Sequence, residues 1–265
     1  MFLGCNMSHL IIEKKNHQAW VWLNRPELHN AFNAELIKEL TECFEEISKD
    51  KNIRLAVLAG KGNSFSAGAD LHWMKSMKEL SEEENFIDAQ KLANLFETIN
   101  NLPIPLIGRI HGAALGGGSG LVSVCDYAIG TEKTILGFTE VRLGLLPAVI
   151  SPYVVAKIGE SHARAWFLSG EKFNQELAFS MGLIHQKSST DMIDQDVEKV
   201  ISSFLKAGPE AAREAKYLIK QIKPFNHFHE KTCRMIAKRR ISKEGQEGMN
   251  ALLTKQQPKW VPSEN

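Results

Sequence analysis

The sequence predicts an α/β fold, in which strands and helices alternate first and helices dominate towards the C-terminus. Three observations support this class. Residues 53–60 form a continuous apolar run, as expected of a strand buried on both faces. Amphipathic helical patterns follow short apolar runs in alternation, which favours strands joined by crossover helices. From Ser161 onward the pattern is mostly helical.

Length and composition predict one large domain, or a domain with a small appendage. The chain has 265 residues, of which 43% are hydrophobic and 24% are charged, as is usual for a globular protein with a sizeable core. Its formal net charge of +1 favours neither nucleic acid nor an anionic membrane as a partner. No run of 18 apolar residues predicts a transmembrane helix.

The cysteine pattern predicts neither a metal site nor a redox motif. The four cysteines are far apart, and no C-x-x-C pair occurs. Isolated reduced thiols are typical of a cytosolic protein. The first ten residues are too poor in apolar side chains for a signal peptide, so we expect a cytoplasmic location and no metal.

The first hundred residues predict five elements in order. Residues 9–24 look like two short strands joined by a polar turn, and a helix capped by Asn33 follows. The strand at 53–60 leads to a loop rich in glycine and serine, F-S-A-G-A-D-L, at 65–71. A long amphipathic helix is expected at 85–102.

The middle of the chain predicts a strand at 102–114 and a short helix at 116–125. Two short strands, D-Y-A-I-G-T and I-L-G-F, follow. A shift in composition near residue 205 begins a segment rich in lysine, arginine and glutamine. We therefore divide the chain into a core at 1–204 and a helical region at 205–265 that we expect to mediate oligomerisation.

The run G-G-G-S-G at 116–120 places four glycines in five positions. It does not complete G-x-G-x-x-G or G-x-S-x-G, and the Gly60 segment has the wrong spacing for a P-loop. A dinucleotide-binding fold, a nucleophile-elbow hydrolase and a P-loop NTPase are therefore disfavoured. Glycines at a helix start expose backbone N–H groups to a ligand oxygen, as in an oxyanion hole. Close packing of the helix against a neighbouring element is the alternative.

Four motifs occur in a characteristic order: 65–71, H-G-A-A-L-G-G-G-S-G-L at 111–121, C-D-Y-A-I-G-T at 125–131 and F-T-E-V-R-L-G-L-L-P at 138–147. Together they resemble the enoyl-CoA hydratase/isomerase (crotonase) superfamily, and most of all its methylglutaconyl-CoA hydratase branch. The resemblance runs from L-N-R-P-E-L-H-N-A-F to E-G-M-N-A-L-L-T-K-Q-Q-P-K-W, which is nearly the whole chain. It implies a spiral of ββα units, C-terminal helices that build a homotrimer or a hexamer of two trimers, and an acyl-CoA thioester substrate without a separate cofactor.

The resemblance also implies roles for individual residues. The backbone N–H groups of Ala69 and Gly117 would bind the thioester oxygen as it gains negative charge. The carboxylate of Glu140 would move a proton. The remaining residues expected to contact the substrate, including its CoA part, are Ser66, Ala67, Gly68, Asp70, Leu71, Gly116, Gly120, Arg142 and Lys259.

The sequence departs from typical hydratases at one position. Hydratases of this superfamily carry two glutamates, one of them in a pattern like G-G-G-x-E, but that position is Gly120 here. One hypothesis is that the distal carboxylate of a glutaconyl-type substrate activates the water, with Gly120 leaving room for it. Arg142 would bind that carboxylate in a bidentate contact, unless it forms a surface ion pair.

Three functions follow from this pattern. The leading interpretation is a lyase that adds water across the C2–C3 double bond of an enoyl-CoA. A Δ3,Δ2-enoyl-CoA isomerase would need only the single Glu140. A non-catalytic acyl-CoA-binding protein would tolerate the loss of one glutamate, although it would not need Glu140 or the two loops.

Overall fold

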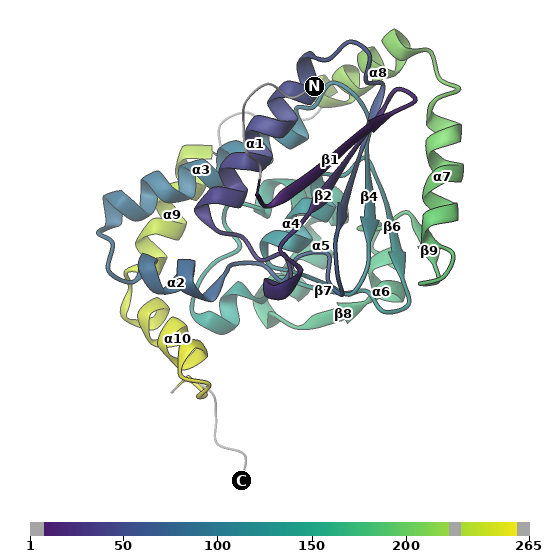
Figure 1. Ribbon diagram of the computed structural model, residues 1–265. Coiled ribbons are helices and arrows are strands. Elements are labelled where there is room, and N and C mark those ends of the chain that lie inside the picture. Colours follow the sequence, from purple (N-terminus) through teal and green to yellow (C-terminus); the bar gives the residue numbers. More distant parts are fainter. Residues whose placement is uncertain (1–7, 223–228, 259–265) are drawn as a thin grey trace.

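A six-stranded sheet forms the centre of the computed structural model, which describes residues 8–222 and 229–258 (Figure 1). Its strand order is β1-β2-β3-β4-β6-β9. The first pair is antiparallel, and every later neighbour is parallel. The strands are β1 (Leu10–Lys15), β2 (Gln18–Leu23), β3 (Leu55–Gly60), β4 (Leu106–Ile110), β6 (Tyr127–Thr131) and β9 (Gln186–Ser188).

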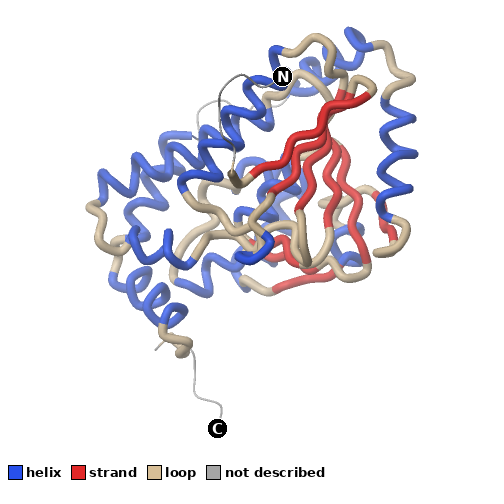
Figure 2. The backbone as a smooth tube through the Cα atoms, in the orientation of Figure 1, coloured by secondary structure: helices blue, strands red, loops and turns tan. Residues whose placement is uncertain are grey.

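A second, smaller sheet lies at the carboxyl ends of the large one (Figure 2). Its order is β5-β7-β8, in which β5 and β7 are parallel. The strands are β5 (Ala113–Leu115), β7 (Ile135–Gly137) and β8 (Lys172–Asn174). The single strand predicted at 102–114 is therefore wrong in one respect. It divides into β4 and β5 because the backbone turns at Gly112, whose φ is +56°.

Helices cover the two faces of the large sheet, and the first half of the chain supplies four of them. They are α1 (Ala34–Lys49), α2 (Leu71–Met77), α3 (Glu82–Asn100) and α4 (Gly117–Val124). The predicted cap of the first is confirmed, because the Asn33 side chain accepts a hydrogen bond from the Leu36 amide at 2.8 Å. Helix α3 begins three residues before the predicted start, because Ser81 and Glu84 form a capping box.

The second half of the chain is mostly helical, as predicted. Two strands in it, β8 and β9, were not predicted, and the first helix begins ten residues before Ser161. The chain also forms two short 3₁₀ turns among the described residues, η1 (Pro26–Leu28) and η2 (Thr139–Leu143). The helices are α5 (Ser151–Ser169), α6 (Gln175–Ser180), α7 (Ile193–Phe204), α8 (Pro209–Ile222), α9 (His229–Arg240) and α10 (Lys243–Leu253).

Strand β3 is buried on both faces, as its continuous apolar sequence predicts. Ala56 and Leu58 face the main hydrophobic core, whereas Leu55 and Val57 face a smaller cluster beneath α7. This alternation follows from the two-residue period of a strand. The core thus extends through the sheet, and the sheet holds the loops at its carboxyl ends in a fixed position.

The C-terminal helices α9 and α10 return to the first half of the chain. Figure 1 shows α9 alongside α3, and α10 packs against α2 and the turn η2. The division at residue 205 stays a prediction, although this packing joins the helical region closely to the core. In the part of the chain that the structure describes, no helix combines the length and apolar character needed to cross a membrane.

Candidate active site

Two loops meet above the carboxyl ends of the sheet. The segment before α2 bonds to β5, because the Ser66 amide donates to Ala113 O at 3.0 Å and the Leu115 amide donates to Ser66 O at 2.9 Å. The glycine run follows β5 directly. Ser66 itself is fully buried, and its hydroxyl donates to Asn30 O at 2.9 Å. It supports this junction, while its neighbours Ala67 and Gly68 line a cavity.

The three consecutive glycines are required by close packing. A Cβ atom on Gly117 would lie 2.7 Å from the Phe32 ring, and one on Gly118 would lie 2.3 Å from Ser66 O. Gly116 has a φ of +51°, which glycine adopts without strain, and a Cβ atom there would lie 3.2 Å from Glu140 Oε1. Close packing therefore explains the run, and it also brings the backbone close to the Glu140 carboxylate. Exposure of the N–H groups to a ligand oxygen stays a prediction.

The amides of Ala69 and Gly117 donate to no other backbone group in the described residues. Around Ala69, Phe32 pairs instead with the flanking residues: its amide donates to Gly68 O, and the Asp70 amide donates to Phe32 O. Gly117 is the first residue of α4, where an N–H has no partner within the helix. Both residues line the same cavity. Two backbone donors are thus available to a ligand there.

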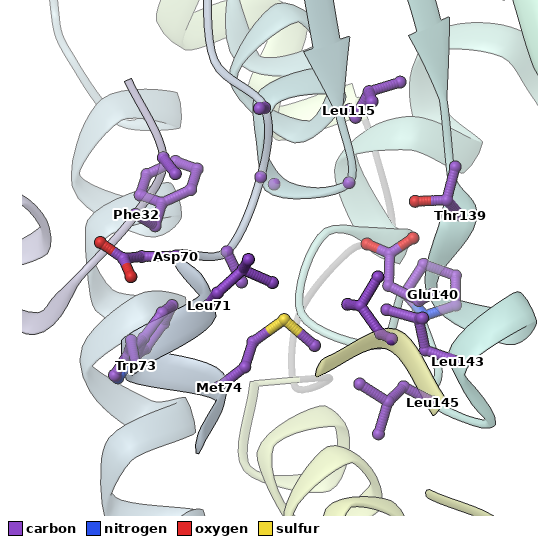
Figure 3. A pocket seen from close by; sticks show the side chains of 18 of the residues that line it. Phe32, Asp70, Leu71, Trp73, Met74, Leu115, Thr139, Glu140, Leu143 and Leu145 are labelled. Carbon is purple, nitrogen blue, oxygen red and sulfur yellow. The ribbon is translucent and has the colours of Figure 1, made fainter. Parts of the chain in front are cut away.

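Glu140 provides the carboxylate of the cavity. It lies in η2, and its Oε2 atom is shielded from solvent without a hydrogen-bond partner in the described residues. Burial raises the pKa of Glu140 to about 7, and a hydrogen bond with its own backbone lowers it by less. Near neutral pH such a group can both accept and donate a proton. Figure 3 shows the carboxylate pointing into the cavity, across from Met74.

The cavity has a volume of about 700 Å³ and is lined mainly by apolar side chains. Leu143 and Leu145 follow Glu140 and lie beside it (Figure 3). Helix α2 contributes five residues, and the C-terminal helices contribute four. These nine are Leu71, His72, Trp73, Met74, Met77, Ile236, Arg240, Met249 and Leu252. Such a lining suits an aliphatic chain and keeps the Glu140 carboxyl poorly hydrated.

Asp70 supports the site from behind. Its carboxylate pairs with Arg25 at 2.8 Å and caps α2 by accepting from the His72 amide at 2.7 Å. Burial alone would raise the pKa of Asp70, but these hydrogen bonds outweigh burial and lower it. Figure 3 shows its carboxylate pointing away from Glu140. Asp70 and the half-exposed Leu71 both line the cavity. Because the Asp70 carboxylate is already paired and points away from Glu140, we infer that it positions the loop that carries Ala69.

Position 120 corrects one prediction. Gly120 is fully buried and is not among the residues that line the cavity in the described chain. A Cβ atom there would lie 2.4 Å from Ile150 Cγ2 and 2.9 Å from the Phe96 ring. These two apolar side chains fill the space that was expected to receive a branched acid. The glycine therefore makes room for packing of the protein rather than for substrate.

Arg142 lines the cavity but already has partners. Its Nε donates to Ser169 O at 3.2 Å, and its guanidinium lies 3.5 Å from the Glu171 carboxylate. Both charged side chains are more than half exposed, so this pair is weak. The other predicted cation, Lys259, lies outside the described residues. No group of three or more His, Cys, Asp or Glu in the described residues could hold a metal ion.

Sequence reasoning missed the supporting role of the loop before α1. Asn30 has a φ of +55°, and its side-chain nitrogen donates to Lys61 O and Ser64 O at 2.9 and 2.8 Å. The Ala67 amide in turn donates to His29 O at 2.9 Å. The polar side chain of Asn30, between Pro26 and the start of α1, was the signal that the sequence offered for this role. It also missed the tail residues of the cavity, because their helices contact distant parts of the chain, such as Leu143 and Asp88, and leave no local pattern.

Comparison with known proteins identifies the family. A family model described as enoyl-CoA hydratase/isomerase matches residues 13–263, so the chain belongs to that family. A Legionella pneumophila crystal structure, provisionally assigned as an enoyl-CoA hydratase/isomerase (crotonase), is 40% identical with a TM-score of 0.79, covering 96% of this chain and 99% of that one. A Shewanella pealeana enoyl-CoA hydratase is 34% identical with a TM-score of 0.80, covering 96% and 97%.

A further relative is the 2,3-dehydroadipyl-CoA hydratase of Escherichia coli, which is 31% identical over 216 residues, covering 81% of this chain and 83% of that protein. The expected mixed α/β crotonase fold is thus confirmed. These similarities show the family and the fold of this chain.

Proposed function

We propose that this protein hydrates an enoyl-CoA, adding water across the C2–C3 double bond. The observation that carries the proposal is the juxtaposition in one apolar cavity of Glu140 Oε2 and two backbone amides, none of which has a partner among the described residues. Membership of the enoyl-CoA hydratase/isomerase family supports the same reaction. The substrate would be an acyl-CoA thioester, with Ala67 and Gly68 near its CoA part.

The chemistry assigns each group a part. The Ala69 and Gly117 amides would hold the thioester oxygen while an enolate forms, a contribution of about 2.7–4 kcal/mol for one such donor. Glu140 would transfer the proton at C2, and its raised pKa suits that task at neutral pH. The apolar lining would exclude bulk water and so strengthen these interactions.

For the acyl group we propose 3-methylglutaconyl-CoA, on the resemblance of the motifs and on one cation. Arg142 lines the cavity, and its exposed pair with Glu171 is weak enough to be exchanged for a substrate carboxylate. Substrate would therefore reach Arg142 and not the filled space beside Gly120.

The test is a turnover assay with 3-methylglutaconyl-CoA and crotonyl-CoA in parallel, read by mass spectrometry for the gain of one water. Wild type, Glu140→Gln and the control Glu45→Gln, an exposed carboxylate on α1, are compared. Hydration that is lost only in Glu140→Gln supports the proposal. Hydration of neither substrate refutes it. Thioester binding without turnover of any substrate, and without an effect of Glu140→Gln, would instead indicate a binding protein.

The second candidate is a Δ3,Δ2-enoyl-CoA isomerase. It is favoured by the filled space at Gly120, which leaves Glu140 as the one carboxylate with a buried, unpartnered oxygen among the described residues of the cavity. A shift of the double bond in a 3-enoyl-CoA, without gain of water, would establish this reaction.

We also propose that α8 mediates trimer formation. Tyr217, Leu218 and Ile219 on this helix are each about 60% exposed, an unusual apolar cluster for a free surface. Sedimentation of a Leu218→Asp variant would test this, since a loss of the trimer is expected.

Cys43, Cys125 and Cys233 are buried free thiols, which fits the proposed cytoplasmic location.

A further inference from the structure

Thr139 places a hydroxyl next to the Glu140 carboxylate. The two residues open η2 and both line the cavity. Figure 3 shows the Thr139 hydroxyl on the same side as the Glu140 carboxylate. A second polar group thus lies on the wall of the cavity that carries the acid.

Packing fixes the orientation of this hydroxyl. A Cβ atom on Gly137 would lie 3.3 Å from Thr139 Cγ2, so the methyl group of Thr139 packs against β7. A β-branched side chain is restricted at χ1, which places the hydroxyl away from that methyl group. The hydroxyl makes no hydrogen bond to another described residue, while its residue is half-buried. A half-buried hydroxyl is stabilised by a partner, and the cavity is where that partner can sit.

The cavity offers few other groups that could hold a water molecule beside Glu140. Position 120 is filled by Ile150 and Phe96, so no second carboxylate fits there. Asp70 is engaged by Arg25 and by the start of α2. Glu27 also lines the cavity, but its side chain is exposed to solvent and is not buried beside Glu140. Among the described residues that line the cavity, Thr139 is adjacent to the acid in the chain and has an uncommitted hydroxyl.

We propose that Thr139 binds the reacting water and thereby takes over the water-holding task of the absent glutamate. This inference rests on the hydratase function proposed above. Water would donate one hydrogen bond to Glu140 and exchange another with the Thr139 hydroxyl, which can donate and accept. Two fixed partners would orient its oxygen towards C3 of the substrate.

The reaction balances with a single carboxylate. Ionised Glu140 takes one proton from the water as the oxygen bonds to C3. The π electrons of the C2–C3 bond move towards the thioester, whose oxygen is held by the Ala69 and Gly117 amides. Glu140 then returns the same proton to C2. The sum is one water added to one enoyl-CoA, and Thr139 ends unchanged.

The experiment separates water addition from proton transfer. Thr139→Val removes the hydroxyl and keeps the branched shape, and Thr139→Ser keeps the hydroxyl. Hydration of the enoyl-CoA that wild type turns over is measured beside deuterium exchange at C2 of the saturated acyl-CoA in heavy water. Exchange requires Glu140 and the two amides but no water at C3.

We expect Thr139→Val to lose hydration about tenfold or more while exchange at C2 changes by less than about twofold, because one hydrogen bond to the reactant is removed. Thr139→Ser should recover most of the hydration rate. Equal hydration by Thr139→Val and wild type would overturn the proposal, as would an equal fall in hydration and exchange. A wild-type protein that exchanges C2 protons but hydrates neither substrate would overturn the hydratase function itself, and the role of Thr139 with it.

Discussion

Replacement of Glu140 by glutamine tests the energetics of the buried carboxyl group. Burial raises the pKa of Glu140 from 4.5 to about 7. At about 1.4 kcal/mol per pH unit, this rise corresponds to about 3 kcal/mol of unfolding free energy. The value is a ceiling, because the residue as a whole is only half-buried and water weakens the effect.

The folded state binds the Glu140 proton more tightly than the unfolded state does, so the unfolding free energy falls as the pH rises. The neutral carboxyl contributes its full stability below pH 4.5, and this contribution is lost as the pH rises through about 7. Glutamine cannot ionise and escapes the loss. The stability of Glu140→Gln relative to wild type should therefore increase by about 2–3 kcal/mol between pH 5 and pH 8.

Urea unfolding at pH 5 and pH 8, at one fixed protein concentration, measures this difference. Glu45→Gln serves as the control, since an exposed carboxylate on α1 should show little change with pH. If the stability of Glu140→Gln relative to wild type were the same at both pH values, the carboxyl would not be destabilised by burial. The assignment of a raised pKa would then fail, and with it the argument for a proton donor at neutral pH.

Three further predictions concern the same region. Gly120→Ala should lower the unfolding free energy by about 1–3 kcal/mol through overpacking, and Gly208→Ala, where a Cβ meets only ordinary contacts, should cost less in the same thermal unfolding assay. Asp70→Asn should cost about 3 kcal/mol because Arg25 stays buried without its charge partner, whereas Glu160→Gln, at the exposed pair with Arg164, should cost less than about 1 kcal/mol; equal costs in urea unfolding would argue against a supporting role for Asp70. The hydration rate, kcat/KM, should rise with pH through about 7 as Glu140 ionises, and a flat profile from pH 5.5 to 8.5 would contradict Glu140 as the base.

Local patterns predicted much of the fold. The Asn33 cap, the buried strand β3 and the glycine run at the start of α4 each depend on a few neighbouring residues, and each is found as expected. The division of residues 102–114 into two strands was missed, since the turn at Gly112 depends on contact with Asn63, whose carbonyl oxygen would clash with any side chain there. Strands β8 and β9 have three residues each, too few for a periodic signal.

The site was predictable where motif order carries it. The two loops, Glu140 and the missing second glutamate could all be read from the sequence. The space beside Gly120 could not, because it is filled by Ile150, which precedes α5, and by Phe96 of α3, and neither is a sequence neighbour of Gly120. Whether a missing side chain leaves a hole or a packed wall depends on such distant neighbours. The paired state of Arg142 depends in the same way on Glu171.

The wall that α9 and α10 give to the cavity separates selectivity from chemistry along the chain. The groups proposed to hold and protonate a thioester lie between positions 69 and 140, whereas Ile236, Met249 and Leu252 line the part of the cavity proposed for the acyl chain. Substitutions near the C-terminus can therefore remodel which acyl groups fit while the reacting groups stay unaltered. During synthesis the reacting groups between positions 69 and 140 emerge from the ribosome first. Helices α9 and α10 emerge later, and only then is the cavity closed.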